Sequence, residues 1–293
     1  MTLREACDWG ASELTRAGIG DAALDAWYLL EHVTGIGRAV YFADQNRVLS
    51  EADETKYRSL IEKRSTRIPL QHLTGVQEFM GLEFQVNGNV LIPRQDTEVL
   101  VEHALDFLKK GQVPAASESA DRIRILDMCT GSGCILISVL HYADKTGMIE
   151  GVGSDFSARA LETAAENARR LGTDAEFVRG DLFEKVQGKY GMILSNPPYI
   201  RTEEIETLQE EVRIHDPREA LDGKEDGLFF YREIVKESTE YLEPGGILAF
   251  EIGWDQAEAV SGFMRERGYT QIRVIRDLAG LERVVSGILP ENR

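Results

Sequence analysis

The fold is decided by the stretch Ile123-Arg124-Ile125-Leu126-Asp127-Met128-Cys129-Thr130-Gly131-Ser132-Gly133. Its first half is rich in apolar residues like a buried strand, and it ends on an aspartate followed by a glycine-rich loop. An apolar run from Cys134 to Tyr142 then predicts a helix. A strand, a glycine loop and a helix in this order are the opening unit of an α/β fold with a parallel sheet.

The same alternation continues toward the end of the chain. A helix is expected before it at 96–109. After it we expect a strand ending at Asp155, a helix at 158–171, strands at 175–178 and 192–194, a helix at 227–241, a strand at 246–252, a helix at 256–267 and strands at 271–276 and 283–289. This pattern predicts a doubly wound α/β sheet over residues 96–293.

The segments before this sheet differ in character. Residues 1–75 show helical spacing and no β-rich alternation, with helices expected at 3–17, 22–33 and 50–65, so we predict a small N-terminal helical domain. Residues 76–95 are predicted to form a β-hairpin linker, with strands at 83–86 and 90–92 around the turn Asn87-Gly88-Asn89. Within the sheet domain, residues 111–119 are expected to form a surface linker.

Composition excludes several classes of protein. The 293 residues are 43% hydrophobic and 28% charged, which is ordinary for a globular protein. No apolar stretch reaches the roughly 20 residues of a membrane span and no secretory segment is evident, so we expect a cytoplasmic protein without membrane contact. Three scattered cysteines favour reduced thiols and no metal site. The net charge of −17 opposes direct binding of nucleic acid.

Polar or turn-forming residues occur where each of the first four expected strands ends. They are Asp127 with the glycine loop, then Asp155, then Asp181, then Asn196-Pro197-Pro198-Tyr199. Ligands of doubly wound sheets bind beyond the carboxyl ends of the strands, near the switch in strand order. We therefore expect a single ligand site at this edge.

The first three strand ends predict a nucleoside-containing cofactor. Gly131 and Gly133 allow close approach of a ligand to the backbone. Asp155 is suitably placed to accept hydrogen bonds from both hydroxyls of a ribose. An NAD site shares these features, but Leu136 stands where the third glycine of G-x-G-x-x-G falls. A cofactor without phosphate, such as S-adenosylmethionine, needs no anion cradle and is favoured over NAD.

The fourth strand end carries the chemistry. Asn196 offers one carbonyl acceptor and one amide donor, and the two prolines have no N–H, so the carbonyls of the segment remain free as acceptors. Such a corner can hold an NH2 group by both hydrogens, while Tyr199 supplies a flat aromatic face. Alone, the motif favours a strand-ending turn with a core tyrosine. With the glycine loop, it predicts methyl transfer to a planar nitrogen.

These two motifs also carry a resemblance. The glycine-loop stretch with Asn196-Pro197-Pro198-Tyr199-Ile200 resembles the class I S-adenosylmethionine-dependent methyltransferases, and within them the HemK/PrmC family of peptide chain release factor glutamine N5-methyltransferases. Further matching segments are Pro69-Leu70-Gln71-His72-Leu73-Thr74-Gly75 with Glu78-Phe79, Ile92-Pro93-Arg94-Gln95-Asp96-Thr97-Glu98, and Glu251-Ile252-Gly253. The resemblance covers essentially the whole chain. It departs at Cys129, usually glycine in the family, and at Gln95, often proline.

The resemblance implies a Rossmann-like class I methyltransferase sheet, S-adenosyl-L-methionine as cofactor, and class 1 release factors as partners that the domain at 1–75 recognises. The implied substrate atom is the side-chain nitrogen of the glutamine in their Gly-Gly-Gln motif. Cofactor contacts are expected from Cys129, Thr130, Gly131, Ser132, Gly133, Asp155, Asp181, Leu182 and Asn196. Thr97 and Glu98 are expected to shape the site at the methionine end of the cofactor. Catalytic residues are expected to be Asn196, Pro197 and Tyr199, and substrate binding to add Pro198.

Other functions remain open from the sequence. An exocyclic NH2 of adenine in nucleic acid or a glutamine of a ribosomal protein fits the same corner, and a non-catalytic cofactor-binding protein is a third alternative. The net negative charge counts against nucleic acid. The irregular, charged segment at 201–225 follows the corner directly. It is expected either to close over the substrate or to be a solvated insertion.

Overall fold

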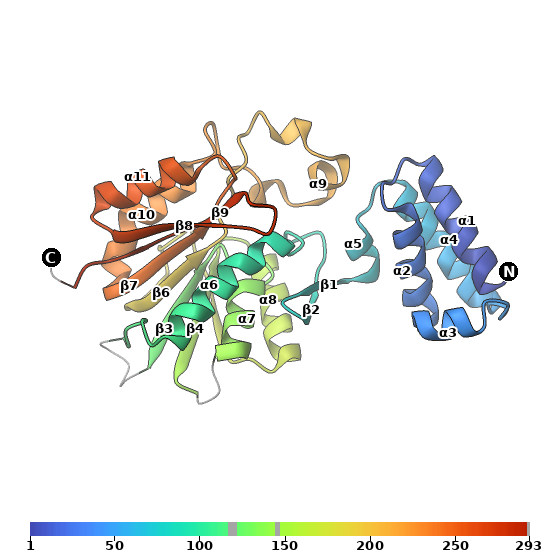
Figure 1. The fold of residues 1–293 in the computed structure, drawn as a ribbon, viewed down its shortest axis with the longest axis horizontal. Helices are drawn as coiled ribbons and strands as arrows, with labels where there is room; N and C mark the ends of the chain where they lie inside the picture. Colours follow the sequence, from blue (N-terminus) through green and yellow to red (C-terminus); the bar gives the residue numbers. More distant parts are fainter. Residues whose placement is uncertain (117–121, 144–146, 292–293) are drawn as a thin grey trace. The chain divides into compact units, whose positions relative to one another are not determined.

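The computed structural model describes residues 1–116, 122–143 and 147–291 (Figure 1). They form two compact units, which are described separately. The first contains residues 1–76 together with 209–215, and the second contains residues 77–208 and 216–293. The first unit thus differs from the predicted segment 1–75 mainly because it includes a short piece of the segment that follows the Asn196 corner.

The first unit is helical. Its elements are α1 (Leu3–Arg16), α2 (Ala22–Thr34), α3 (Arg38–Ala43), α4 (Glu51–Ser65), α5 (Leu70–Thr74) and α9 (Glu210–His215). A reciprocal cap between Thr2 and Glu5 starts α1. Leu14, Leu30 and Tyr57 are buried in the common core, and the hydroxyl of Tyr57 donates to the carbonyl of Ala26 at 3.1 Å. The core thus comes from helices far apart in sequence.

The predicted hairpin exists, and its strand at 83–86 is nearly right, but the partner strand precedes it in the sequence instead of following it. The two paired strands are β1 (Val76–Phe79) and β2 (Leu82–Gln85). Met80 and Gly81 between them have φ angles of +54° and +72°, as a two-residue turn of this type requires. The Asn87-Gly88-Asn89 segment instead makes a local turn in which the side chain of Asn87 accepts from the N–H of Asn89. Residues 90–92 therefore form no strand.

The second unit is the doubly wound sheet. Besides the hairpin, its elements are η1 (Gln95–Thr97), α6 (Glu98–Lys109), β3 (Ile123–Met128), α7 (Cys134–Ala143), β4 (Ile149–Asp155), α8 (Ala158–Leu171), β5 (Ala175–Arg179), β6 (Tyr190–Ser195), η2 (Ile205–Thr207), η3 (Arg218–Ala220), α10 (Phe229–Tyr241), β7 (Leu242–Glu251), α11 (Ala257–Arg267), β8 (Thr270–Arg276) and β9 (Glu282–Ile288). The strand order is β5-β4-β3-β6-β7-β9-β8. β9 runs antiparallel to both of its neighbours, and the other pairs are parallel.

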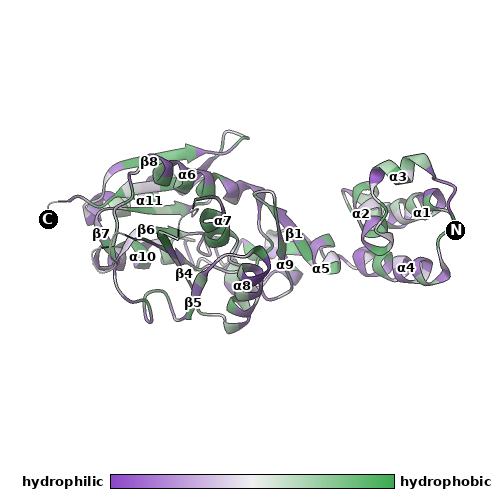
Figure 2. Cartoon of the chain, turned by 90° about the horizontal axis from the view of Figure 1, so that it is seen from below, coloured by the Kyte–Doolittle hydropathy of each residue, from purple (hydrophilic) through white to green (hydrophobic). Residues whose placement is uncertain are grey.

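Helices cover both faces of this sheet. α6, α7 and α8 lie on one face, and α10 and α11 lie on the other (Figure 1). α7 is hydrophobic along most of its length (Figure 2), and its residues from Cys134 to Leu140 are all buried. The predicted doubly wound architecture is confirmed. Among the described residues, no helix is long and apolar enough to cross a membrane.

The predicted linker at 111–119 is in part a packed segment. Residues 117–119 lie outside the described residues. Val113 and Ala116 are buried, and the carbonyl of Pro114 lies so close to Gly191 that a Cβ there would come within 2.2 Å of it. Part of the stretch 113–116 therefore packs against β6, whereas Gly111 and Gln112 are exposed as predicted.

Candidate active site

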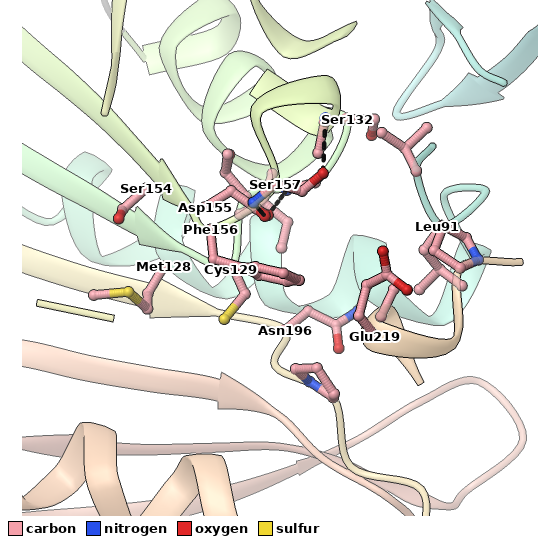
Figure 3. A pocket seen from close by; sticks show the side chains of 18 of the residues that line it. Leu91, Met128, Cys129, Ser132, Ser154, Asp155, Phe156, Ser157, Asn196 and Glu219 are labelled. Atoms are coloured by element: carbon pink, nitrogen blue, oxygen red, sulfur yellow. Dashed lines mark hydrogen bonds between the residues drawn. The ribbon is translucent and has the colours of Figure 1, made fainter. Parts of the chain in front are cut away.

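A cavity that opens to solvent on one side lies in the second unit at the carboxyl ends of β3, β4, β5 and β6. Strand order reverses there, because the chain runs outward from β3 to β5 and then returns to β6 beside β3. Figure 3 shows Asp155, Phe156, Asn196 and Glu219 around the space.

Most of the predicted site residues line this cavity. Cys129, Thr130, Gly131, Ser132, Asp155, Asp181, Leu182, Asn196 and Pro198 lie in its wall, and so does Thr97. Gly133, Pro197 and Tyr199 are not among the lining residues. Glu98 also lies elsewhere, because its carboxylate accepts the N–H of Met80 at 2.6 Å and so holds the hairpin turn. The sequence therefore predicted the position of the cavity and most of its lining residues, but not every residue that it named lines the cavity.

The two loop glycines have different structural reasons. Gly131 has a φ of +56°, and a Cβ there would meet no atom within 4 Å. Gly133 has a φ of +80°, and a Cβ there would come within 2.8 Å of Ile137 Cδ1 and 3.2 Å of Ala164 Cβ. Gly131 therefore leaves room beside the cavity, whereas Gly133 permits close packing of α7 against α8.

The carboxylate of Asp155 is fixed by backbone donors. Its Oδ2 accepts the N–H of Gly131 at 3.0 Å, and its Oδ1 accepts the N–H of Ser157 at 2.9 Å (Figure 3). Burial raises its pKa against these hydrogen bonds. The next residue, Phe156, is 52% exposed and lies in the cavity wall. An oriented carboxylate beside an open aromatic ring suits a ribose with an attached planar base.

Asp127 supports the loop from behind. It is fully buried, and its Oδ2 accepts from the hydroxyl of Thr130 at 2.6 Å and from the N–H of Leu136 at 3.4 Å. Burial raises the pKa of Asp127 to about 7. Its second oxygen has no hydrogen-bond partner among the described residues. Asp127 thus ties the loop to the first turn of α7 without lining the cavity.

The departure at Cys129 has a conformational meaning. Its φ is +61°, in the left-handed region that favours glycine. Burial raises the pKa of its thiol, and the nearby charges of Asp155 and Asp127 act in the same direction. The thiol is therefore neutral at ordinary pH, and the residue introduces backbone strain but no charge.

The Asn196 corner is anchored on its outer side. Asn196 Nδ2 donates to the hydroxyl of Thr97 at 3.4 Å. The hydroxyl of Tyr199 donates to Glu251 Oε1 at 3.2 Å, and burial raises the pKa of Tyr199. Tyr199 packs against the hydrophobic core between the sheet and α10 and α11. The tyrosine therefore braces the corner in this structure.

Two further segments contribute to the cavity wall, and none of their residues was predicted individually as a site residue. The wall also includes Asn89, Val90, Leu91, Pro93 and Arg94 from the segment after the hairpin, and Pro217, Glu219 and Ala220 from the segment after the corner. An ion pair of 2.6 Å between Arg94 and Asp216 joins these two segments. Burial raises the pKa of Asp216 to about 6. The sequence signals for these segments were the match of Ile92-Pro93-Arg94 to the family and the position of residues 201–225 directly after the corner.

The charges of the wall select among ligands. It carries the carboxylates of Asp155, Asp181 and Glu219 and one guanidinium, that of Arg94, which is paired with Asp216. Such a wall repels phosphate and attracts a cationic ligand. Among the described residues, no group of three or more His, Cys, Asp or Glu side chains is arranged to hold a metal ion. The wall thus fits a nucleoside that bears positive charge.

Comparisons with known proteins agree with this geometry. The family model of the PrmC N-terminal domain matches residues 5–75, and that of the methyltransferase small domain matches residues 112–227. The release factor glutamine methyltransferase of Geobacter sulfurreducens is 39% identical over 98% of this chain and 96% of its own length. That of Caulobacter vibrioides is also 39% identical, over 98% of this chain and 97% of its own.

A solved structure supports the fold alone. A methyltransferase from Pyrococcus furiosus matches with a TM-score of 0.50 and 15% identity, over 72% of this chain and 90% of its own. The sheet is therefore the Rossmann-like sheet of class I methyltransferases. The fold, the match to the methyltransferase domain and the 39% identity to full-length relatives agree on one family for this chain. It belongs to the family of release factor glutamine methyltransferases.

Proposed function

We propose that the protein transfers a methyl group from S-adenosyl-L-methionine to the side-chain nitrogen, N5, of the glutamine in the Gly-Gly-Gln motif of class 1 peptide chain release factors. The observation that carries this proposal is the position of Asn196. It lines the cavity at the end of β6, and its NH2 group is already used by Thr97. Its carbonyl oxygen therefore remains as an acceptor for a substrate amide.

The acidic wall supports the choice of cofactor. When bound, S-adenosylmethionine supplies a sulfonium methyl group that is open to attack by a nucleophile. Asp155 would accept the ribose hydroxyls, and Asp181 with Leu182 would border the adenine. Thr130, Ser132 and Cys129 would border the rest of the cofactor. The open space beside Gly131 would leave room for it. Gly133 would act indirectly, by allowing the loop to pack.

The corner would then solve the problem that an amide nitrogen is a poor nucleophile. Its lone pair is delocalised into the carbonyl, so attack requires the nitrogen to begin to pyramidalise. Asn196 Oδ1 and the backbone carbonyl of Pro197 would accept the two N–H hydrogens and orient the lone pair. Both dipoles stabilise positive charge as it grows on nitrogen. The amide nitrogen held by Asn196 and Pro197 would accept the methyl group as the bond from that group to the cofactor's sulfur is given up, and the acidic N-methylated amide cation would then lose its extra proton to water.

The remaining parts would handle the protein substrate. Pro198 would border the entering side chain, and Tyr199 would keep the corner in place. The helical unit of residues 1–76 would bind a remote surface of the release factor, while an exposed glutamine loop enters the cavity. The proposal for the helical unit is supported by its match to the PrmC N-terminal domain.

The variant Asn196→Ala tests the proposal. We expect it still to bind S-adenosylmethionine in a calorimetric titration, and to transfer methyl to release factor about 100- to 1000-fold more slowly. Unchanged transfer would show that the corner is not the transfer site. A wild-type protein that binds the cofactor but methylates no release factor would instead support a non-catalytic role.

A further inference from the structure

Buried polar groups link the cavity wall to the end of β7. Asn196 Nδ2 donates to Thr97 Oγ1 at 3.4 Å, and the hydroxyl of Tyr199 donates to Glu251 Oε1 at 3.2 Å. The side chain of Thr97 also acts on the carboxylate of Glu251, whose pKa it lowers. Thr97 and Glu251 are each 2% exposed, so both are shielded from solvent. The amide of Asn196 is thus connected to a carboxylate that does not itself line the cavity.

The carboxylate of Glu251 is costly where it lies. Its Oε2 has no hydrogen-bond partner among the described residues. The nearby guanidinium of Arg283 forms ion pairs with Asp96 at 3.2 Å and Asp277 at 3.1 Å instead. Burial of an unpaired carboxylate destabilises a fold, and a neutral side chain of similar size would destabilise it less. A role that requires a charged acceptor would account for glutamate at this position.

Hydrogen bonds in this series have a fixed direction. An ionised carboxylate can only accept, so the hydroxyl of Thr97 that faces Glu251 donates to it. Thr97 Oγ1 is then an acceptor, and the NH2 end of Asn196 turns toward it. The Oδ1 end of the same amide is consequently left for the cavity. A neutral amide in place of Glu251 would be able to donate to Thr97 and so permit the reverse orientation.

Gln256, which follows β7, holds the Asn196 corner at a second position. Gln256 Nε2 donates to the carbonyl of Tyr199 at 2.9 Å and to that of Gly227 at 3.3 Å. Gln256 Oε1 accepts from the N–H of Gly253 at 2.9 Å. Tyr199 is therefore held at both its hydroxyl and its carbonyl by residues that follow or end β7. With the backbone fixed in this way, the orientation of Asn196 depends on its side-chain hydrogen bonds.

We propose that Glu251 is a positioning residue of the active site, which orients the amide of Asn196 through Thr97 and braces Tyr199 directly. The inference rests on the proposed function, because the orientation matters for catalysis only if Asn196 Oδ1 receives the substrate amide. Glu251 touches neither cofactor nor substrate in this scheme. Its effect is on the geometry of transfer and not on the binding of either ligand.

The test compares Glu251→Gln, Thr97→Val and their combination with the control Glu243→Gln. Glu243 is a buried carboxylate at the opposite end of the same strand, 5% exposed. We expect Glu251→Gln to lower kcat by about 10- to 100-fold, with KM for S-adenosylmethionine and for release factor changed little. The double variant should lose no more than the worse single one, because both act through the same hydrogen bonds. Glu243→Gln should keep wild-type kcat.

Equal kcat in Glu251→Gln and Glu243→Gln, or additive losses in the double variant, would overturn the positioning role. A second readout separates this outcome from failure of the proposed function. The side-chain amide signals of Asn196 in ¹⁵N NMR spectra should shift in Glu251→Gln and Thr97→Val and stay unchanged in Glu243→Gln. Such shifts in a protein that methylates no release factor would refute the substrate but keep the positioning role. Unshifted signals would refute the positioning role even in an active enzyme.

Discussion

At the scale of single residues, two glycines in one loop should fail in different ways. Gly131→Ala places a methyl group in open space beside the cavity, whereas Gly133→Ala places one within 2.8 Å of Ile137 Cδ1. Both have positive φ, which costs an alanine about 1 kcal/mol or more. We expect Gly131→Ala mainly to weaken binding of S-adenosylmethionine in a calorimetric titration. Gly133→Ala should lower the free energy of unfolding by about 2 kcal/mol or more in urea denaturation.

The reverse pattern would contradict these assignments. A Gly133→Ala protein as stable as the wild type would mean that α7 and α8 can separate at little cost. An unchanged affinity for the cofactor in Gly131→Ala would mean that the ligand does not approach this position.

Glu251 should give stability and activity opposite pH dependences. Burial raises its pKa to about 7 from an ordinary value of 4.5, against hydrogen bonds from Thr97 and Tyr199 and the charge of Arg283, while Asp96 acts with burial. The folded state therefore binds the proton more tightly than the unfolded state. Its contribution to stability is fully present below about pH 4.5 and is lost as pH rises through about 7.

Urea denaturation between pH 5 and 8 measures this contribution. The slope is of order 1 kcal/mol per pH unit for one such group, and Glu251→Gln should reduce the slope seen in the wild type. Transfer activity should rise over the same range, because the ionised carboxylate orients Thr97. An identical pH dependence of stability in both proteins would contradict the raised pKa. Activity independent of pH from 6 to 8 would contradict the link to catalysis.

At the scale of elements, helix α9 packs in the helical unit although its neighbours in sequence belong to the sheet unit. Arg64, 4% exposed, pairs with Asp25 at 2.7 Å and with Glu211 of α9 at 2.9 Å. The segment at 201–225 is therefore not simply a solvated insertion. Part of it belongs to the first unit, and part of it, including Glu219, belongs to the cavity wall.

We expect Arg64→Ala to lower the free energy of unfolding by about 3 to 5 kcal/mol, because it leaves the buried carboxylate of Asp25 unpaired. Glu211→Gln should cost only about 1 kcal/mol or less, because Glu211 is partly exposed and Arg64 keeps Asp25. Urea denaturation of the full chain measures both. A loss for Arg64→Ala no larger than that for Glu211→Gln would argue against the buried pair as the anchor.

Periodic elements were predictable from the sequence, while the local turns were not. The helix at 158–171 and the strands that end near Asp127 and Asp155 agree with the structure, because their apolar periodicity is long and regular. The turn of the hairpin and one of its strands were misplaced because Asn87-Gly88 is the stronger turn signal in sequence. Tertiary contacts decide instead for Met80 and Gly81, where Glu98 binds the N–H of Met80. No local sequence pattern predicts a hydrogen-bond partner eighteen residues away.

At the scale of the whole molecule, the strand ends located the ligand site because topology brings them together at one edge of the sheet. Asp155 and Asn196, about forty residues apart, line one cavity for this reason. The other side of the wall was not predictable. Arg94 and Asp216 lie in segments without a regular apolar pattern. They are far apart in sequence, and their ion pair of 2.6 Å forms only when the chain folds. The acidic character of the wall likewise depends on which carboxylates the fold brings together.

The central claim is that this cavity methylates the glutamine of a release factor. The most direct measurement is transfer of labelled methyl from S-adenosylmethionine to purified release factor, with a second factor in which the glutamine of the Gly-Gly-Gln motif is replaced. The account predicts label on the wild-type factor and none on the replaced one. Label on both would place the target elsewhere on the factor, and label on neither would contradict the proposed substrate.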